Sequence, residues 1–256
     1  MAIRRCLLAS LCLLLSHIAF AADAWQTLAP DLAYQRFQPL AMNPWARVHA
    51  FRFSLKRYRL AVALASERHR LASSVATFAK QADALLAING GFFTPTLRPL
   101  GLRIRHGEVL SPLRGISWWG IFYVRHNRAH IVPPRAYRSA RHIEFAVQGG
   151  PRLLVGGRIP PLKRGVAERS AVGITKRGDI ILLVTEHYPL STTDLAKFMR
   201  EKLQCRDALN LDGGSSSQLY ASIGNTKVDV RGLAPVTDAI LLTKRLAHHR
   251  KQTKRN

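Results

Sequence analysis

The segment Ala208-Leu209-Asn210-Leu211-Asp212-Gly213-Gly214-Ser215-Ser216-Ser217 joins an apolar run to a polar, glycine-rich loop. Its first four residues predict a buried strand. A carboxylate then stands where the strand opens into the loop, and such positions commonly carry functional groups. An Asp-Gly turn in which Asp212 bonds its own loop is the competing interpretation. That turn does not require the three serines, so we predict that this segment both anchors the fold and contributes to a site.

Two further segments place a glycine pair after an apolar strand: Ile88-Asn89-Gly90-Gly91-Phe92-Phe93 and Gln148-Gly149-Gly150-Pro151-Arg152. Paired glycines allow the backbone to come close to a ligand. Backbone N–H groups in such turns can form a site for an anion. A simple tight turn explains either segment taken alone.

A fourth segment, Glu168-Arg169-Ser170-Ala171-Val172-Gly173-Ile174, places a charged pair directly before a strand. An exposed ion pair of little energetic value is one interpretation. The other is that the guanidinium of Arg169 forks onto a phosphate, a geometry that it matches better than an ammonium does. Composition alone leaves the two interpretations balanced.

The pattern of strands and helices predicts a mixed, strand-rich α+β fold, in one domain with a few short helices packed on the sheet. Helical spacing appears near residues 75–82, with Ser73 or Ser74 as N-cap, and again from about Thr193 to Leu203. Strands and helices do not alternate regularly, which argues against a doubly wound sheet. The predicted strands are 48–53, 58–64, 85–88, 102–105, 118–124, 129–132, 143–147, 171–175, 180–185, 208–211 and 236–242.

The two ends of the chain differ from the predicted domain at residues 22–245. Residues 1–21 combine a basic start, an apolar run and a small-x-small cleavage site, which predicts a signal peptide and therefore export to the periplasm or the cell exterior. Residues 246–256 are rich in basic side chains and predict a disordered tail. Removal of the signal peptide leaves Cys205 as the one cysteine. We expect it to be buried, because it follows a predicted helix and precedes an apolar strand. A catalytic thiol is the alternative, although no neighbouring motif supports it.

The net charge of +24 suits anionic partners. For an exported protein these include envelope polymers, phospholipid headgroups and phosphorylated glycans. Aromatic residues make up 8% of the chain and do not interleave with the basic residues, which argues against a specific nucleic-acid site.

Together, the four segments resemble the phosphodiester glycosidase family, and they occur in the family's order across roughly residues 64–242. The residues that carry the resemblance are 88–93, 150–153, 169–173 and 210–217. The resemblance implies a hydrolase that cleaves a glycosyl–phosphate bond in a sugar-1-phosphodiester of an envelope or extracellular glycan.

Phosphate is a good leaving group, so neutralising it matters more for this bond than general-acid help. On that basis we predict three catalytic residues. Asp212 would act as base, nucleophile or metal ligand, and Arg169 would bind the phosphate. Glu168 is the second carboxylate candidate. Asn89 would hold the sugar or orient Asp212, and Arg152 would assist at the phosphate. The remaining substrate-binding candidates are Gly90, Gly91, Gln148, Gly150, Gly213, Gly214, Ser215 and Ser216.

No cofactor is required by the sequence, although calcium is a candidate ion near Asp212. Two alternative functions belong to different classes. A non-catalytic protein that binds anionic envelope polysaccharide would keep the basic surface without turnover. A charge-driven binder of nucleic acid or membrane surfaces would depend on the basic tail and lose affinity steeply with salt.

Overall fold

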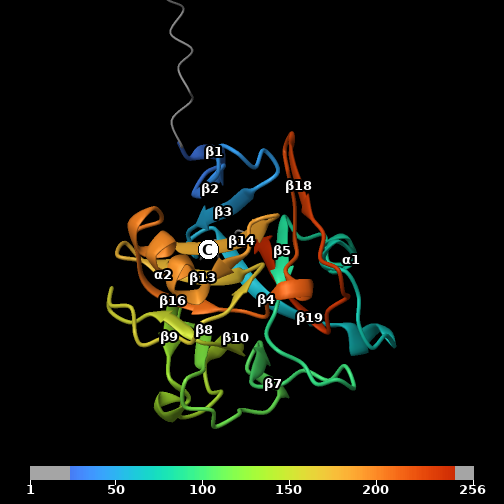
Figure 1. The fold of residues 1–256 in the computed structure, drawn as a ribbon. Helices are drawn as coiled ribbons and strands as arrows, with labels where there is room; N and C mark the ends of the chain where they lie inside the picture. The colour runs from blue at the N-terminus through green and yellow to red at the C-terminus, as the bar shows by residue number, and fades with distance from the viewer. Residues whose placement is uncertain (1–23, 246–256) are drawn as a thin grey trace, which may run out of the picture.

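The computed structural model describes residues 24–245, which form three antiparallel β-sheets with two α-helices (Figure 1). The predicted signal peptide and basic tail lie outside the described residues. No helix among residues 24–245 is long and apolar enough to cross a membrane.

The largest sheet has seven strands in the order β1-β2-β3-β14-β13-β16-β11, and every neighbouring pair is antiparallel. Its centre is apolar on both faces, as expected for strands covered on each side. Its strands are β1 (Gln26–Ala29), β2 (Leu32–Phe37), β3 (Arg47–Phe53), β14 (Ile180–Glu186), β13 (Ser170–Thr175), β16 (Cys205–Asn210) and β11 (Arg152–Leu154).

The fold also contains two five-stranded sheets and a two-stranded ribbon, which pairs β12 (Val166–Ala167) with β15 (Leu190–Ser191). The second sheet has the order β7-β6-β10-β8-β9, with β7 (Glu108–Ser111), β6 (Arg103–Arg105), β10 (Ile143–Gly149), β8 (Gly120–Arg125) and β9 (Arg128–Val132). The third has the order β18-β17-β5-β19-β4, with β18 (Thr226–Val230), β17 (Leu219–Ile223), β5 (Leu86–Asn89), β19 (Asp238–Lys244) and β4 (Tyr58–Leu64).

The main core lies between the three sheets. One cluster of buried apolar side chains takes Phe51 from the first sheet, Phe145 from the second and Ile240 from the third. On β14, Leu182 faces this cluster while its neighbour Leu183 faces the opposite side of the sheet. Because both faces of β14 are buried, its sequence is one continuous apolar run.

Each α-helix covers the outer face of a different sheet. Helix α1 (Val75–Gln81) packs on the third sheet, and helix α2 (Thr192–Glu201) packs on the first (Figure 1). Both helices begin at a serine whose hydroxyl accepts a backbone N–H: Ser74 from Thr77 at 3.2 Å, and Ser191 from Asp194 at 3.1 Å. Three 3₁₀ turns complete the structure, at Ala65–Arg68, Pro134–Ala136 and Gly214–Ser216.

Most predicted elements appear within a residue or two of their expected bounds, but the predicted single sheet is wrong. The short helices pack on two of three sheets, and all strand pairs in residues 24–245 are antiparallel. The lead-in expected before Asn43 forms β1 and β2 instead. The hairpin β17–β18 was also not predicted, because Ser, Asn and Lys interrupt its apolar pattern.

Candidate active site

Three chain segments meet where β5 ends, β16 ends and β13 begins. Asn89 closes β5, Ser170 opens β13, and Asp212 follows β16 by two residues. The backbone N–H of Asp212 donates to the carbonyl of Gly90 at 3.2 Å, and that of Leu211 donates to the carbonyl of Ser170 at 2.9 Å. The sequence segments that contain Asn89, Ser170 and Asp212 therefore form one locus.

Asn89 is the centre of this junction. Its side chain is fully buried and uses both ends of the amide. Nδ2 donates to the carbonyl of Asp212 at 2.8 Å, while Oδ1 accepts the Ser170 hydroxyl at 2.6 Å and the Gln218 backbone N–H at 3.1 Å. Of its two predicted roles, holding the sugar and orienting Asp212, this geometry supports the second.

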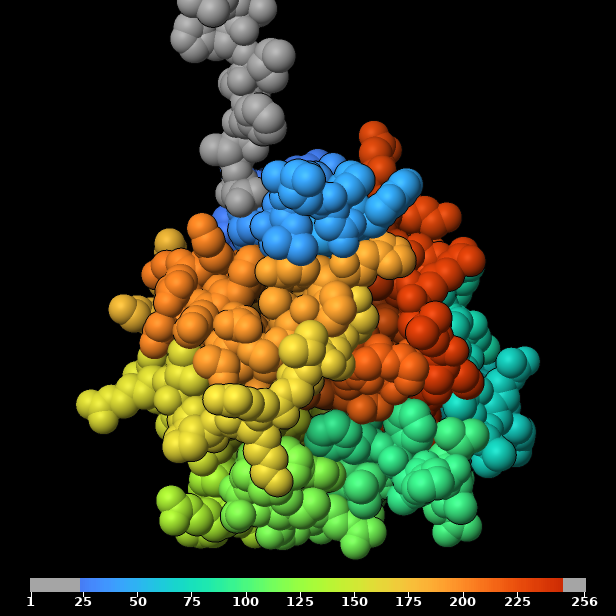
Figure 2. Space-filling view, in the orientation of Figure 1, coloured from blue at the N-terminus to red at the C-terminus, as the bar shows by residue number. Residues whose placement is uncertain are grey.

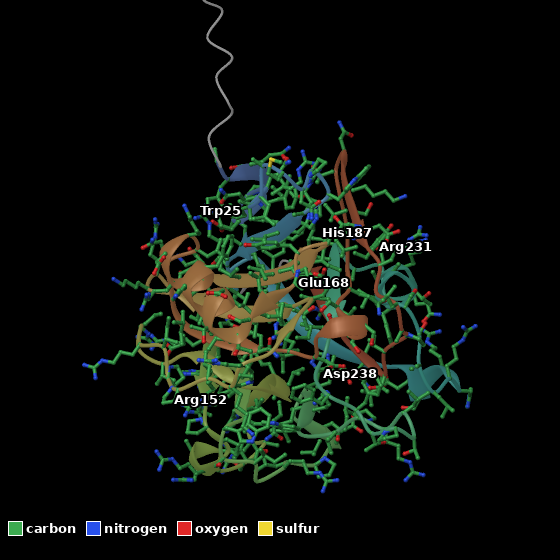
Figure 3. The ribbon with its side chains drawn as sticks, viewed as in Figure 1. Trp25, Arg152, Glu168, His187, Arg231 and Asp238 are labelled. Carbon is green, nitrogen blue, oxygen red and sulfur yellow. The ribbon has the colours of Figure 1, made fainter. Side chains whose placement is uncertain are left out.

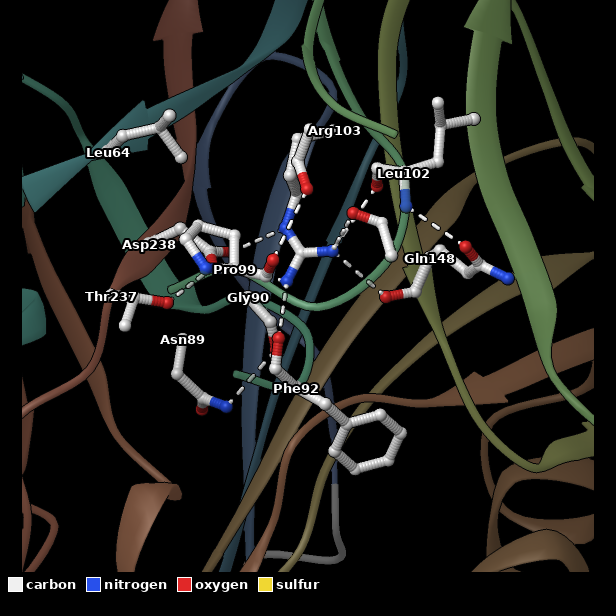
Figure 4. A network of polar contacts seen from close by, with 12 residues as sticks. Leu64, Asn89, Gly90, Phe92, Pro99, Leu102, Arg103, Gln148, Thr237 and Asp238 are labelled. Carbon is white, nitrogen blue, oxygen red and sulfur yellow. Dashed lines mark hydrogen bonds and ion pairs between the residues drawn. The ribbon is translucent and has the colours of Figure 1, made fainter. Parts of the chain in front are cut away.

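A buried ion pair behind the junction was not anticipated from the sequence. Arg103 and Asp238 are both fully buried and make a two-pronged contact, with Nε to Oδ1 at 2.9 Å and Nη2 to Oδ2 at 3.1 Å (Figure 4). The remaining guanidinium hydrogens point at backbone carbonyls, so the cation is satisfied on all sides. These acceptors are the carbonyls of Phe92, Gly101, Leu102 and Gln148.

The glycine pair after Asn89 makes room for this ion pair. A Cβ at Gly90 would overlap the Asp238 carboxylate, and one at Gly91 would overlap the carbonyl of Gln148. Both glycines are buried. Close packing therefore accounts for Gly90 and Gly91, and their predicted contact with substrate stays a prediction.

A cavity of about 560 Å³ opens in front of the junction. Asp212 is the one carboxylate among its described lining residues, and Arg169 lies on the same wall. Phe92 and the exposed Trp118 supply aromatic surface. The rest of the lining is Gly150, Pro151, Pro161, Leu162, Lys163, Arg164, Gly165, Ala167, Thr192, Asn210, Gly213 and Gly214. Figure 2 shows the yellow segment near residues 155–165 crossing this face of the molecule.

The carboxylate of Asp212 is held in place and poorly hydrated. Burial raises its pKa, an effect that a hydrogen bond from Ser216 and one from the Gly213 N–H, at 3.0 Å, oppose. The Asp238 charge adds to the increase and the Arg103 charge reduces it. Desolvation is the largest of these contributions, so Asp212 is a stronger base than an exposed aspartate.

Arg169 joins two loops and keeps one nitrogen free. Its Nε donates to the carbonyl of Leu190 at 2.8 Å and its Nη2 to the carbonyl of Gly165 at 2.6 Å. Nη1 has no hydrogen-bond partner among residues 24–245, and it lies 3.9 Å from where a Cβ of Gly213 would stand. The guanidinium is thus fixed beside the Asp212 loop with a donor to spare.

Glu168 requires a correction. Its Oε1 accepts the Tyr188 N–H at 2.9 Å, its Oε2 accepts the Thr185 hydroxyl, and its side chain does not line the cavity. Because Glu168 and Arg169 are neighbours in an extended segment, their side chains point in opposite directions. Glu168 supports the site through its backbone, since its carbonyl accepts the Gly214 N–H at 2.8 Å.

Gln148 and Arg152 also lie outside the cavity. The Gln148 side chain is fully buried and bonds backbone groups of Leu102 and Arg114, which fixes the intervening loops. Arg152 lines a separate cavity, and Figure 3 shows it well apart from Glu168. Of the third predicted segment, only Gly150 and Pro151 reach the site.

Most backbone N–H groups of the substrate-binding candidates at residues 213–216 are bonded within the chain itself. The N–H of Gly213 donates to Asp212, that of Gly214 to Glu168, and that of Ser216 to the carbonyl of Gly213. Within the described residues, Ser215 keeps an N–H without a partner. Gly213 and Gly214 line the cavity, whereas Ser215 and Ser216 do not.

Asn210 lines the cavity and was not predicted as a site residue. Its Nδ2 donates to the carbonyls of Gly150, at 3.0 Å, and Leu211, at 2.5 Å. Its buried Oδ1 has no partner among the described residues. The alternation of strand side chains puts residues i and i+2 on one face, so the spacing to Asp212 could have indicated it.

No group of three or more His, Cys, Asp or Glu residues in the described part of the chain is placed to hold a metal ion. Asp212 as a metal ligand therefore stays a prediction.

Comparison with known proteins identifies the family of this chain. The model of the phosphodiester glycosidase family matches residues 82–243, which include every residue of the junction. The uncharacterized protein YigE of Escherichia coli K12 is 33% identical over 156 residues, a match that covers 56% of this chain and 61% of YigE.

Solved structures share the fold at low sequence identity. The catalytic domain of zebrafish N-acetylglucosamine-1-phosphodiester alpha-N-acetylglucosaminidase, auto-inhibited by its pro-peptide, has a TM-score of 0.66 at 19% identity, over 86% of each chain. A putative exported protein of Burkholderia pseudomallei has a TM-score of 0.61 at 14% identity, over 77% of this chain and 74% of that one. The match to the family model covers most of the described residues, and this chain therefore belongs to the phosphodiester glycosidase family.

Proposed function

We propose that this protein hydrolyses the glycosyl–phosphate bond of a sugar-1-phosphodiester in the cavity at Asp212. The observation that carries the proposal is the placement of Asp212 and the free Nη1 of Arg169 on one wall, next to Gly213. A general base and a phosphate-binding cation are thereby set side by side.

The reaction needs a base for the attacking water and a cation for the phosphate that leaves. Water attacks the anomeric carbon while Asp212 takes its proton, and the bond from that carbon to the phosphate oxygen breaks. The phosphate monoester leaves with the electron pair. It needs no proton from an acid, and Arg169 neutralises its charge. This is consistent with one carboxylate, rather than the usual two, among the described residues lining the cavity.

The other walls suit a sugar. Trp118 and Phe92 offer apolar ring faces, and the Phe92 ring rests on Trp119 with centroids 4.8 Å apart. Lys163 and Arg164 add positive charge at the rim for an anionic acceptor.

An exported setting suits this site. A net charge of +24 favours anionic glycans of the cell envelope, and one structural neighbour is described as a putative exported protein. We propose that the substrate is an envelope or extracellular glycan carrying sugar-1-phosphodiesters.

The test is sugar release from a panel of sugar-1-phosphodiesters that includes an N-acetylglucosamine diester. Asp212→Asn should abolish release, because the base is lost while its hydrogen bonds can still form. The matched control is Asp83→Asn, an exposed residue with φ of 47°, which asparagine tolerates. Equal turnover in Asp212→Asn and the control would refute the proposed base. Binding of the panel by folded protein without release would favour the non-catalytic polysaccharide-binding alternative.

A further inference from the structure

A second cavity has a volume of about 430 Å³, and two of its lining residues are chain neighbours of residues that line the catalytic cavity. Two of its lining residues are arginines, Arg135 and Arg152, and its described lining contains no carboxylate. The other lining residues are Leu113, Gly115, Ser117, Pro133 and Pro134. The walls are therefore largely apolar around two positive charges.

The side chain of Arg152 is positioned by packing. A Cβ at Gly120 would lie 2.7 Å from its Cγ and 2.8 Å from a methyl group of Leu209. The arginine stem thus occupies the space that the glycine leaves open on β8. This fixes the guanidinium at the cavity instead of leaving it to sample solvent.

The guanidinium itself has no partner. Among residues 24–245 it makes no hydrogen bond or ion pair, unlike Arg103 and Arg169. Burial lowers the pKa of Arg152 and the Arg135 charge lowers it further, while Asp207 opposes both. The Asp207 carboxylate is already engaged, with Oδ1 accepting the Gly156 N–H at 2.9 Å and Oδ2 accepting Nε of Arg206 at 2.8 Å.

The linings of the two cavities adjoin along the chain. Trp118 and Pro151 line the catalytic cavity, while their chain neighbours Ser117 and Arg152 line the second one. A ligand that extends from the catalytic cavity past Trp118 and Pro151 would approach the residues that line the second cavity. The paired N–H donors of each guanidinium match the oxygens of a phosphate. A half-buried cation is also stabilised more by an anionic partner than a fully hydrated cation is.

We propose that the second cavity binds another phosphate of the same substrate molecule, so that the enzyme prefers glycans carrying more than one phosphate. The choice of substrate rests on the function proposed above, whereas the anion site itself does not.

The anion site is tested without turnover. In the Asp212→Asn, Arg169→Gln protein, inorganic phosphate should shift the Arg152 Nε–H and Gly120 amide resonances at constant ionic strength. The same titration of an additional Arg152→Leu variant should leave Gly120 unmoved. A Gly120 amide that fails to respond to phosphate, or responds equally in both proteins, would overturn the site.

The occupant is tested by comparing two ligands in the Asp212→Asn protein. One is N-acetylglucosamine-1-phosphoglycerol, and the other carries a second phosphate on the glycerol. The doubly phosphorylated ligand should bind about tenfold more tightly, as expected for one added charge-assisted contact. Arg152→Leu should reduce this ratio to near one, and Arg158→Leu, an exposed arginine just beyond the same strand, should preserve it.

A mixture of the singly phosphorylated ligand and free phosphate distinguishes the two sources of the anion. The mixture should not reproduce the tenfold gain. An equal gain would overturn the assignment to the same molecule in favour of a free anion.

The melting temperature separates binding from a structural role. Because Arg152 makes no ion pair or hydrogen bond among the described residues and its stem packs on Gly120, Arg152→Met should keep or raise the melting temperature. A clear decrease together with an unchanged ratio of affinities would show that Arg152 serves the fold instead.

Discussion

Asn89 provides the sharpest test of how the site is built. Asn89→Ala removes the partners of the Asp212 carbonyl, the Gln218 N–H and the Ser170 hydroxyl, and the last two belong to buried residues. Each buried group left without a partner costs ~1–3 kcal/mol, and single substitutions seldom exceed ~5 kcal/mol. We therefore expect a loss of ~3–5 kcal/mol in the free energy of unfolding. For a domain of this size that corresponds to a decrease of about 10 °C in melting temperature.

The effect on catalysis should differ from that of a residue that touches the sugar. Without the bond from Nδ2, the Asp212 backbone is free to move, so kcat should fall more than tenfold while KM changes little. The assays are urea denaturation and steady-state kinetics on the diester that is turned over best. Asn225→Ala, in the exposed turn between β17 and β18, is the matched control. A variant with an unchanged unfolding free energy and a raised KM would refute the positioning role and reinstate a direct sugar contact.

Three further predictions concern single groups. Because the base must be ionised and burial raises the pKa of Asp212, kcat/KM should fall with decreasing pH at a pH above the usual range of an aspartate. Ser216→Ala, which removes a hydrogen bond that lowers this pKa, should move the acidic limb of the profile to higher pH, and an unmoved limb would count against Asp212 as the base. Arg103→Met should reduce the unfolding free energy measured in urea by ~3–5 kcal/mol, because it leaves the Asp238 charge buried without a partner. Adding Asp238→Leu should restore part of the lost unfolding free energy. No recovery in the double variant would contradict the explanation by an isolated buried charge. Burial raises the pKa of Cys205 to about 12, so its thiol should resist a disulfide reagent at pH 8 until denaturant is added, and prompt labelling of the folded protein would contradict its burial.

Local patterns in the sequence identified much of this molecule. Apolar periodicity placed most strands, by alternation, and both helices, by helical spacing. The strand before Asp212 was correctly expected to be buried. The four glycine-containing or charged segments, in their order, indicated the family that the comparison then showed. These features are encoded by neighbours in the chain, so the sequence alone was sufficient to find them.

The contacts that fix the site were decided by the tertiary structure. Arg103 and Asp238 stand 135 residues apart, and nothing near either residue indicates the other. Asn89 turned out to support Asp212, and Arg152 turned out to face a different cavity from Arg169. Glu168 and Arg169 are adjacent in sequence but serve the structure and the cavity respectively.

The physical reason is that periodicity specifies which side chains share a face of one strand, but not which sheet that face meets. Here three sheets pack around one core, and the polar groups at their edges find partners only after that packing is set. The sequence by itself therefore determined the local elements and the carboxylate at the end of β16. Only the tertiary structure decided which neighbours hold that carboxylate, shield it from water and place a free guanidinium nitrogen beside it.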